Sequence, residues 1–202
     1  MICIKVKNLA SLRCFHICDA MACWHLCKMN RGVEIEIDAL TESVVEVLSG
    51  KTFKTEVIEA TIEFLNSIHK KNGWKFNWKK EARLDNRNIF KLTLLSKKSV
   101  LLGLICTETK EDHVHIHLVE NSPENVGRAK IYQGIAGNLF AFACKKSYEK
   151  GFDGAVSFYA KTQLVEHYSV TLGAMLFSNN KMVIPEKNAY LLVCKYFAHE
   201  KK

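Results

Sequence analysis

The sequence predicts an α/β (α+β) domain with a single mixed, mostly antiparallel central sheet flanked by helices. Two observations carry this prediction: several short runs alternate apolar and polar residues, as half-buried strands do, while longer stretches repeat apolar residues at helical spacing. The 202 residues, 48% hydrophobic with only two prolines, suffice to bury a full core without metal or disulfides. We therefore expect one domain over residues 29–202, preceded by a segment of different character at 1–28.

The first elements expected are a short strand and a long helix. Residues 33–37 alternate aliphatic with acidic side chains, which predicts a strand with one wet face. Residues 54–71 carry apolar side chains at helical spacing, and Asn72-Gly73 is a typical C-terminal stop. This pattern predicts a helix over the whole of 54–71.

Aromatic residues at alternate positions follow this helix. Trp74, Phe76 and Trp78 are separated and followed by lysines. Such interleaving can stack bases and hold phosphate, but a strand that buries the three rings and exposes its lysines explains the pattern more simply. We expect that strand.

The remaining elements complete the sheet. Strands are expected at 89–96 and 99–107, joined as an antiparallel hairpin at Lys97-Lys98, because both runs are apolar and short. The rest of the pattern predicts, in order, a strand at 113–120, a helix at 138–149, a strand at 153–160, a helix at 161–172 and two strands at 174–184 and 189–197.

Composition narrows the class of protein without identifying a partner. No apolar run approaches the roughly 20 residues that span a bilayer, so we expect a soluble, cytoplasmic protein. Lys and Arg outnumber Asp and Glu by 29 to 21, a net charge of +8, which tolerates anionic partners but selects none. Cys106, Cys144 and Cys194 lie in apolar runs, which is typical of small buried thiols in a reduced protein.

The segment 1–28 contains the one arrangement that suggests a metal. It holds a doubled C-x-H-x-C pattern, formed by Cys14, His16, Cys18, Cys23, His25 and Cys27. These ligand types suit zinc, but the usual C-x2-C spacing is missing. We therefore expect no metal site, and a poorly ordered or non-native extension, with Met29 as an alternative start.

A glycine-containing loop precedes the helix expected at 138–149. Gly134, Ala136 and Gly137 lie where the chain enters that helix, so backbone N–H groups can converge there without side chains in the way. A helix N-terminus carries partial positive charge and favours phosphate. The segment lacks the glycine patterns of Rossmann and P-loop proteins. We expect it to form a pyrophosphate cradle.

This segment resembles the Q/R-x-x-G-x-G/A signature of the GNAT acyl-CoA N-acyltransferases. Gly134 and Ala136 match, Ile131 occupies the Gln/Arg position, and Lys130 or Arg128 would supply the missing charge. The resemblance covers residues 33–197, because the order of elements also agrees. It includes Tyr168 and Gly173, one residue further apart than the family's tyrosine-then-glycine pattern; residues 113–197 are also similar to bacterial members that indicate no substrate.

The resemblance implies a GNAT-like fold and acetyl-CoA as co-substrate. The residues that it places around acetyl-CoA are Leu118, Val119, Arg128, Lys130, Gln133, Gly134, Ile135, Ala136, Gly137 and Asn138. It also implies direct attack of an amine on the thioester, so the cysteines are not needed as nucleophiles.

Acid–base groups follow from that mechanism. The amine must be neutral to attack the thioester. A lysine-like amine with a pKa near 10.4 is neutral only about 0.04% of the time at pH 7, so a nearby base that removes its proton would speed the reaction. Glu120, at the end of the strand 113–120, is the first candidate for this base. His117, expected with His115 on the opposite strand face, is the reserve, and Tyr168 would protonate the departing thiolate by resemblance. Alternating histidines at 113, 115 and 117 could also bind a metal, but a wet strand face explains them better.

Two classes of function remain open. The first is an acetyl-CoA-dependent N-acetyltransferase whose amine acceptor is a small molecule or a protein. The second is a catalytically silent GNAT-like module that binds acyl-CoA, or nucleic acid through Lys70-Lys71 and Lys79-Lys80. We favour the enzyme, expect neither nucleic acid nor membrane as partner, and leave a homodimer open.

Overall fold

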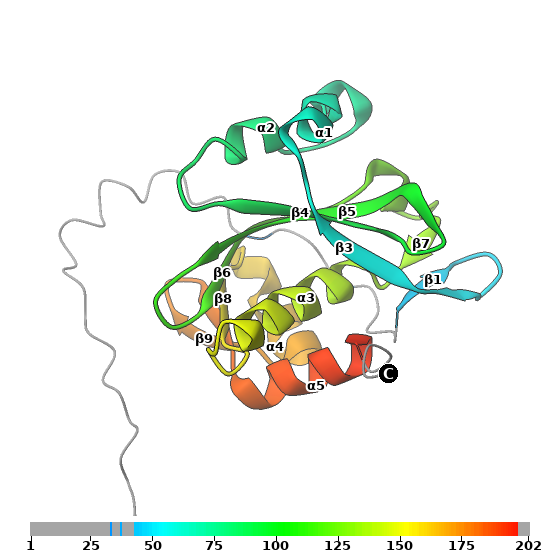
Figure 1. The fold of residues 1–202 in the computed structure, drawn as a ribbon. Helices are drawn as coiled ribbons and strands as arrows, with labels where there is room; N and C mark the ends of the chain where they lie inside the picture. The colour runs from blue at the N-terminus through cyan, green and yellow to red at the C-terminus, as the bar shows by residue number, and fades with distance from the viewer. Residues whose placement is uncertain (1–32, 34–36, 38–42, 198–202) are drawn as a thin grey trace, which may run out of the picture. The chain divides into compact units, whose positions relative to one another are not determined.

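A seven-stranded sheet forms the centre of the computed structural model, which describes residues 33, 37 and 43–197 (Figure 1). Its strands are, in spatial order, β3 (Thr55–Glu59), β4 (Asn88–Leu94), β5 (Lys97–Thr109), β6 (Val114–Asn121), β8 (Val156–Tyr159), β10 (Lys181–Ile184) and β9 (Met175–Ser178). All neighbouring pairs are antiparallel except β6 and β8, which run parallel. The predicted fold class is therefore confirmed.

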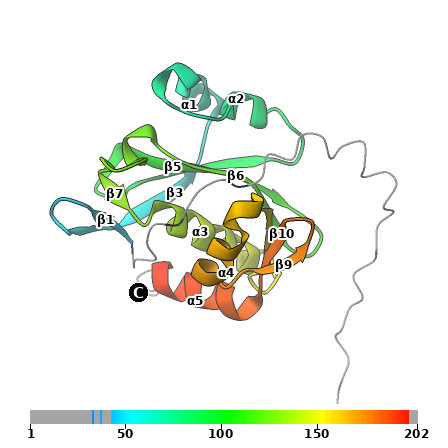
Figure 2. The same cartoon turned by 180° about the vertical axis from the view of Figure 1, so that it is seen from behind.

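Helices cover both faces of this sheet (Figures 1 and 2). The helical elements are α1 (Ile62–Ser67), η2 (Lys70–Asn72), α2 (Trp78–Glu81), η3 (Pro123–Asn125), α3 (Ile135–Glu149), η4 (Thr162–Leu164), α4 (Val165–Leu172) and α5 (Glu186–Phe197). The views show α1 and α2 over one face and α3, α4 and α5 on the other side. A second, three-stranded sheet consists of β1 (Val44–Glu46), β2 (Thr52–Phe53) and β7 (Tyr132–Gln133), with β1 in the middle.

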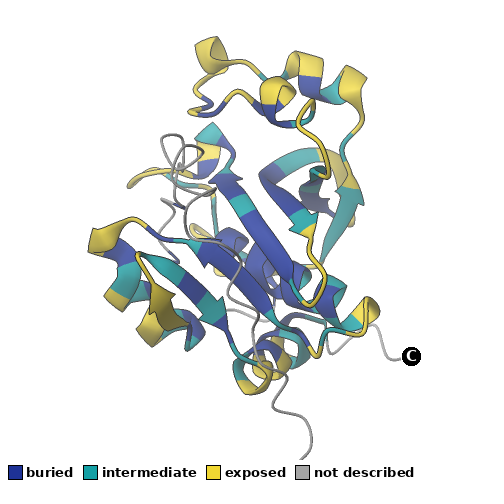
Figure 3. Ribbon diagram, turned by 90° about the vertical axis from the view of Figure 1, so that its left-hand side faces the viewer, coloured by how far each residue is buried: buried dark blue, intermediate teal, exposed yellow. Residues whose placement is uncertain are grey.

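The core is divided by the sheet into two clusters of buried side chains. The larger cluster lies beneath α3 and includes Ile105 of β5, whereas the smaller one lies beneath α1 and α2 and includes Leu104 and Cys106. This alternation along β5 is what a strand buried on both faces requires. Figure 3 shows the central strands buried and the α1–α2 region largely exposed.

A bulge interrupts the alternation of β6. Thr107 pairs with Ile116 but Cys106 pairs with Leu118, so His117 is the extra residue. Ile116 accordingly packs beneath α3, while Leu118 packs beneath α1 and α2. Before the bulge, even-numbered residues of β6 face α3. After it, even-numbered residues face α1 and α2, and odd-numbered residues such as Val119 face α3.

The predicted helix over 54–71 is wrong in its first part. Residues Thr55–Glu59 form β3 at the edge of the sheet, where β4 satisfies their backbone groups. Helix α1 begins only at Ile62, because the side chain of Thr61 accepts a hydrogen bond from the Phe64 backbone N–H and caps the helix there. Both β3 and α1 contain apolar residues whose spacing fits a helix, so spacing alone does not separate the strand from the helix.

The predicted strand at Trp74–Trp78 is also wrong, although the burial of its rings is right. Trp74, Phe76 and Trp78 are buried, but Trp78 opens α2 with Asn77 as its cap. The segment is irregular because its backbone bonds to a carboxylate of β6, described below, and not to a neighbouring strand.

The last two predicted strands are replaced by a hairpin and a helix. The stretch 174–184 contains both β9 and β10, because Asn179 and Asn180 have positive φ and form the turn between them. The stretch 189–197 belongs to helix α5. Its buried residues have helical spacing, and they are Ala189, Leu192 and Tyr196.

Other predicted elements are confirmed with small shifts. The β4–β5 hairpin turns at Leu95-Ser96, two residues before the predicted position, and α3 begins at Ile135 and not at 138.

Cys106 and Cys144 are buried free thiols and Cys194 is half-buried. The segment 1–28, with its doubled C-x-H-x-C pattern, lies outside the described residues. Among the residues described, no helix is both long and apolar enough to cross a membrane.

Candidate functional site

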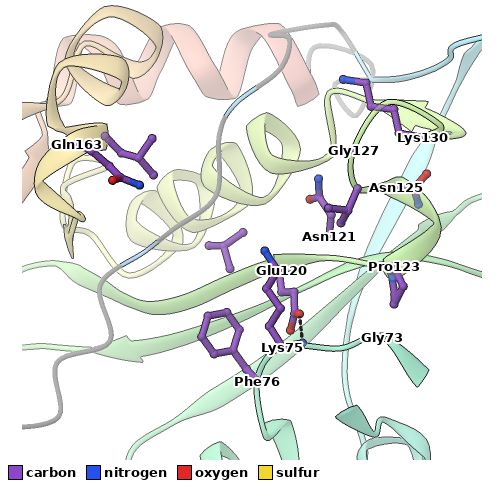
Figure 4. A pocket seen from close by; sticks show the side chains of 13 residues that line it. Gly73, Lys75, Phe76, Glu120, Asn121, Pro123, Asn125, Gly127, Lys130 and Gln163 are labelled. Carbon is purple, nitrogen blue, oxygen red and sulfur yellow. Dashed lines mark hydrogen bonds between the residues drawn. The ribbon is translucent and has the colours of Figure 1, made fainter. Parts of the chain in front are cut away.

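A cavity of about 780 Å³ lies at the end of β6 (Figure 4). Its volume falls in the range of small-molecule and cofactor sites. Three stretches of chain and η4 form its walls, and the lining residues are Gly73, Lys75 and Phe76, then Val119, Glu120 and Asn121, then Pro123, Asn125, Val126, Gly127 and Lys130, and finally Gln163 and Leu164.

The cavity exists because β6 and β8 separate. Their parallel pairing covers only Val114–Ile116 of β6, and the strands part where the bulge at His117 begins. Beyond it, Val119, Glu120 and Asn121 all line the cavity, which consecutive strand residues can do only where the strand's own edge borders the space. On the β8 side, the backbone N–H of Val33 donates to the carbonyl of Tyr159 at 2.6 Å.

Glu120 is a buried carboxylate in the wall of this cavity. Its Oε1 accepts a hydrogen bond from the Lys75 backbone N–H at 2.6 Å, and its Oε2 accepts one from the indole Nε1 of Trp78 at 2.7 Å. Burial raises the pKa of Glu120, and hydrogen bonds from Lys75, Trp78 and the Phe76 backbone only partly oppose this. A carboxylate with a raised pKa beside a cavity is suited to accept a proton.

Two other polar groups of the cavity suit a ligand. The side-chain oxygen Oδ1 of Asn121 is buried and accepts no hydrogen bond among the described residues. An orphaned acceptor of this kind is costly unless a ligand or water supplies a donor. Lys130, on the loop that leads from β6 to α3, brings a positive charge to the opposite wall.

The structure brings only part of the predicted cofactor set to this cavity. Val119 and Lys130 line it, whereas Leu118 is buried beneath α1 and α2 and Arg128 is exposed on the loop. The rest lie at the start of α3 or in β7, and they are Gln133, Gly134, Ile135, Ala136, Gly137 and Asn138.

The start of α3 is enclosed by its neighbours. Gly134 is the helix N-cap with φ of 84°, and the four residues after it are buried. Asn138 donates to the Gly134 carbonyl and accepts from the Thr55 hydroxyl, while Gln133 pairs with Val45 of β1. The pyrophosphate cradle at this turn stays a prediction.

Tyr168 is buried in the core and does not itself line the cavity, although Leu164, four residues before it, does. Its ring contacts Phe140 and Phe158, its side chain is 0% exposed, and its hydroxyl donates to the Val33 carbonyl at 3.4 Å. The predicted acid role is untested, and this packing gives it no support.

The histidines of β6 form a cluster on the face toward α1 and α2. His115 Nδ1 lies 2.7 Å from the Ser157 hydroxyl, and His117 Nε2 lies 2.8 Å from a Glu108 carboxylate oxygen. Because the bulge reverses the alternation, His115 and Glu120 share a sheet face, which corrects the expectation of opposite faces. Burial lowers the pKa of His117, whose Glu108 contact partly compensates. Among the described residues, no group of three or more His, Cys, Asp or Glu could hold a metal ion.

Sequence reasoning missed the wall formed by Gly73, Lys75 and Phe76. This segment was assigned to a strand, so its approach to the end of β6 was not foreseen. Asn121 was missed because an asparagine at the end of a strand is common. Only its place in the sequence could have indicated Asn121, because it directly follows Glu120, the predicted base.

Comparison with solved structures finds similarity in fold. Mutant forms of the spermidine/spermine N-acetyltransferase SpeG from Vibrio cholerae match with a TM-score of 0.47 and 15% identity, over 68% of this chain and 97% of that chain. A structure of AtaTR bound with AcCoA matches with a TM-score of 0.46 and 14% identity, over 69% and 98%. A KacTA–DNA complex matches with a TM-score of 0.44 and 14% identity, over 69% and 98%. SpeG is a spermidine/spermine N-acetyltransferase, and the likeness of this chain to it is in fold alone.

No protein-family model and no curated protein sequence matches this chain.

Proposed function

We propose that this protein is an acetyl-CoA-dependent N-acetyltransferase of the GNAT type. The observation that carries the proposal is the buried Glu120 carboxylate in the wall of a 780 Å³ cavity, at the place where two parallel strands part. Such a cavity offers a strand edge, a base and positive charge within one site.

Two features of the cavity fit acetyl-CoA. The edge of β6 beyond Ile116 does not pair with β8, so its backbone groups can bond to an extended amide-bearing chain. Lys130 lies on the wall where phosphates would be neutralised. When bound, acetyl-CoA supplies the thioester whose acetyl group is transferred.

Glu120 performs the proton transfer in this proposal. The ammonium of an acceptor amine must lose a proton before its nitrogen can attack, and the raised pKa of Glu120 makes this carboxylate a better base than an exposed one. The carboxylate holds that proton on the side of the cavity formed by Lys75 and Phe76. A thiolate with a pKa near 8.5 is a tolerable leaving group, so the proposal does not need Tyr168 as an acid.

Acetyl-CoA binding is the first test. Ligand at about 100 times its dissociation constant adds about 2.7 kcal/mol of stability, so we expect a clear rise in Tm. Lys130→Glu should weaken binding by placing negative charge near the phosphates, whereas Lys150→Glu, at an exposed position after α3, should not. Absence of any Tm rise at millimolar acetyl-CoA would reject the proposal. Acetylation of a panel of amines then tests turnover.

A catalytically silent module that binds acyl-CoA is the second candidate. It is favoured by the donors that occupy both Glu120 oxygens and by the core position of Tyr168. Binding of acetyl-CoA with no amine acetylated would select it. A nucleic acid ligand would show affinity falling steeply with salt, whereas acetyl-CoA binding should persist.

A further inference from the structure

The cavity has two chemically different sides. The loop side, from Pro123 to Lys130, is the side assigned to the co-substrate under the proposed function. The other side is formed by Gly73, Lys75 and Phe76, which belong to residues 62–83, called here the α1–α2 arm. Under the proposed function, the side formed by the arm, with Gln163 and Leu164 of η4, remains for the acceptor.

The arm is strongly basic. Residues 62–83 contain five lysines and Arg83 against Glu63 and Glu81, and the Glu81 carboxylate is paired with Arg87. The arm's five lysines are exposed, but only Lys75 lines the cavity. The electrostatic potential around the arm is thus positive, and one of its cations, Lys75, lines the cavity.

The cavity floor beside this cation accepts hydrogen bonds. Glu120 and Asn121 end β6 there, and the Asn121 Oδ1 has no donor among the described residues. The Lys75 ammonium interacts electrostatically with the Glu120 carboxylate, which places cation and acceptors in one neighbourhood. Figure 4 shows Lys75, Glu120 and Asn121 together at the cavity.

We infer that the acceptor is an amine that also carries an anionic group, a carboxylate or a phosphate, with its amine toward Glu120 and Asn121 and its anionic group toward Lys75. A polycation such as spermidine would have to bring its charges past the basic arm. The inference rests on the proposed transferase function of the same site. Lys75 is the specificity-determining residue and Asn121 is a positioning residue.

Matched pairs of amines test this inference. O-phosphoethanolamine is compared with ethanolamine, and L-alanine with ethylamine, while spermidine represents the polycations. In acetylation assays we expect the member of each pair that carries the anionic group to have a KM about five to ten times lower than the member that lacks it, and the difference to shrink as salt is added. The two pairs distinguish phosphate from carboxylate recognition.

Variants assign the effect to residues. Lys75→Met should remove the difference in KM with little change in kcat, whereas Lys79→Met, an equally exposed lysine of the arm outside the cavity lining, should preserve it. Asn121→Ala should raise KM for the amine and leave the KM for acetyl-CoA unchanged. Preference for spermidine, or an unchanged ratio in Lys75→Met, would overturn the inference.

Equilibrium binding separates this inference from the proposed function. The Tm of the full chain is measured with each amine in the absence of acetyl-CoA. Stabilisation by the anionic amines that is lost in Lys75→Met supports the ligand class even where no amine is acetylated, and in that case only the transferase proposal fails. Equal Tm values with both members of each pair, combined with equal KM values, would reject the proposed ligand class without contradicting acetylation itself.

Discussion

At the scale of single residues, the proposed base Glu120 is also an anchor, because its carboxylate holds the α1–α2 arm at the wall of the cavity. Oε1 bonds to the Lys75 backbone and Oε2 to the Trp78 indole. An anchored carboxylate is fixed in position but shares its lone pairs. Which role dominates is a question that substitution can answer.

Glu120→Gln should reduce both turnover and stability. Loss of the base lowers kcat by about 10²- to 10⁴-fold, and the new NH₂ group faces one of the two donors, which costs about 1–3 kcal/mol of unfolding free energy. Trp78→Phe is the matched control, since it removes one donor and keeps the carboxylate. It should raise the pKa of Glu120 further and move the acidic limb of the pH–rate profile upward, because the base must be ionised. Turnover unchanged in Glu120→Gln would show that the residue only anchors the arm.

His115 should make the protein less stable in acid. Burial, with repulsion from His117, His113, Lys181 and Lys110, lowers the pKa of His115 to about 2. The unfolded state binds a proton below about pH 6.5 while the native state does not, so stability falls as pH drops from 6.5 toward 2. At pH 5 this group alone removes about 2 kcal/mol relative to pH 7.

Urea unfolding at pH 5 and pH 7 checks that expectation. His115→Gln can still bond to the Ser157 hydroxyl but does not titrate, so its two unfolding free energies should differ by about 2 kcal/mol less than those of the wild type. An equal pH dependence in both proteins would mean that His115 is protonated in the native state.

At the scale of elements, the sequence predicted the type of an element wherever its apolar residues followed a single spacing, that of a strand or that of a helix. The β4–β5 hairpin and α3 were predicted because their runs are long and each favours one structure. The stretch 54–71 was not, because Val57 and Ile58 fit a helix face as well as a half-buried edge strand, and pairing with β4 decided between them. Pairing partners are long-range facts that local periodicity does not contain.

The cavity depends on one close approach between elements. A Cβ at Gly103 of β5 would lie 2.8 Å from the Glu120 carbonyl oxygen and 3.1 and 3.2 Å from the side chains of Ile135 and Leu139. Gly103→Ala should therefore displace the end of β6, lower stability by about 1–3 kcal/mol and weaken acetyl-CoA binding. Gly50→Asn is the control, since Gly50 has φ of 67° and nothing within 4 Å, and asparagine tolerates that conformation. A Tm of Gly103→Ala equal to that of the wild type would refute this packing.

At the scale of the whole molecule, the site could be predicted only in part. Glu120 was singled out because it closes an alternating run, and Lys130 because it lies near a recognisable loop; both line the cavity. Lys75 and Asn121 were not singled out, because their place in the cavity arises from the parting of β6 and β8, which depends on a bulge at His117. A bulge inserts one residue without a sequence signature, so the geometry that makes the cavity is invisible before the strands are paired.

Two truncations test where the folded domain begins. Val33 and Ile37 are 1% and 4% exposed, and their backbone N–H groups donate to Tyr159 and His167 at 2.6 and 2.7 Å. Removal of residues 1–28 keeps both contacts and should leave the free energy of unfolding and acetyl-CoA binding unchanged. Removal of residues 1–42 takes away two buried aliphatic side chains, each contributing about 1.5–3 kcal/mol, a large fraction of the roughly 5–15 kcal/mol that stabilises a domain.

Urea unfolding of the full chain and of both truncated proteins measures this difference. We expect the unfolding curve of the protein lacking residues 1–28 to superimpose on that of the full chain. The protein lacking residues 1–42 should unfold at a clearly lower urea midpoint, because it also loses the hydrogen bond from Val33 to the end of β8, which does not pair with β6. Zinc content is measured on the same samples. Equal destabilisation by both truncations, or stoichiometric zinc that disappears with residues 1–28, would show that the doubled C-x-H-x-C segment belongs to the folded protein.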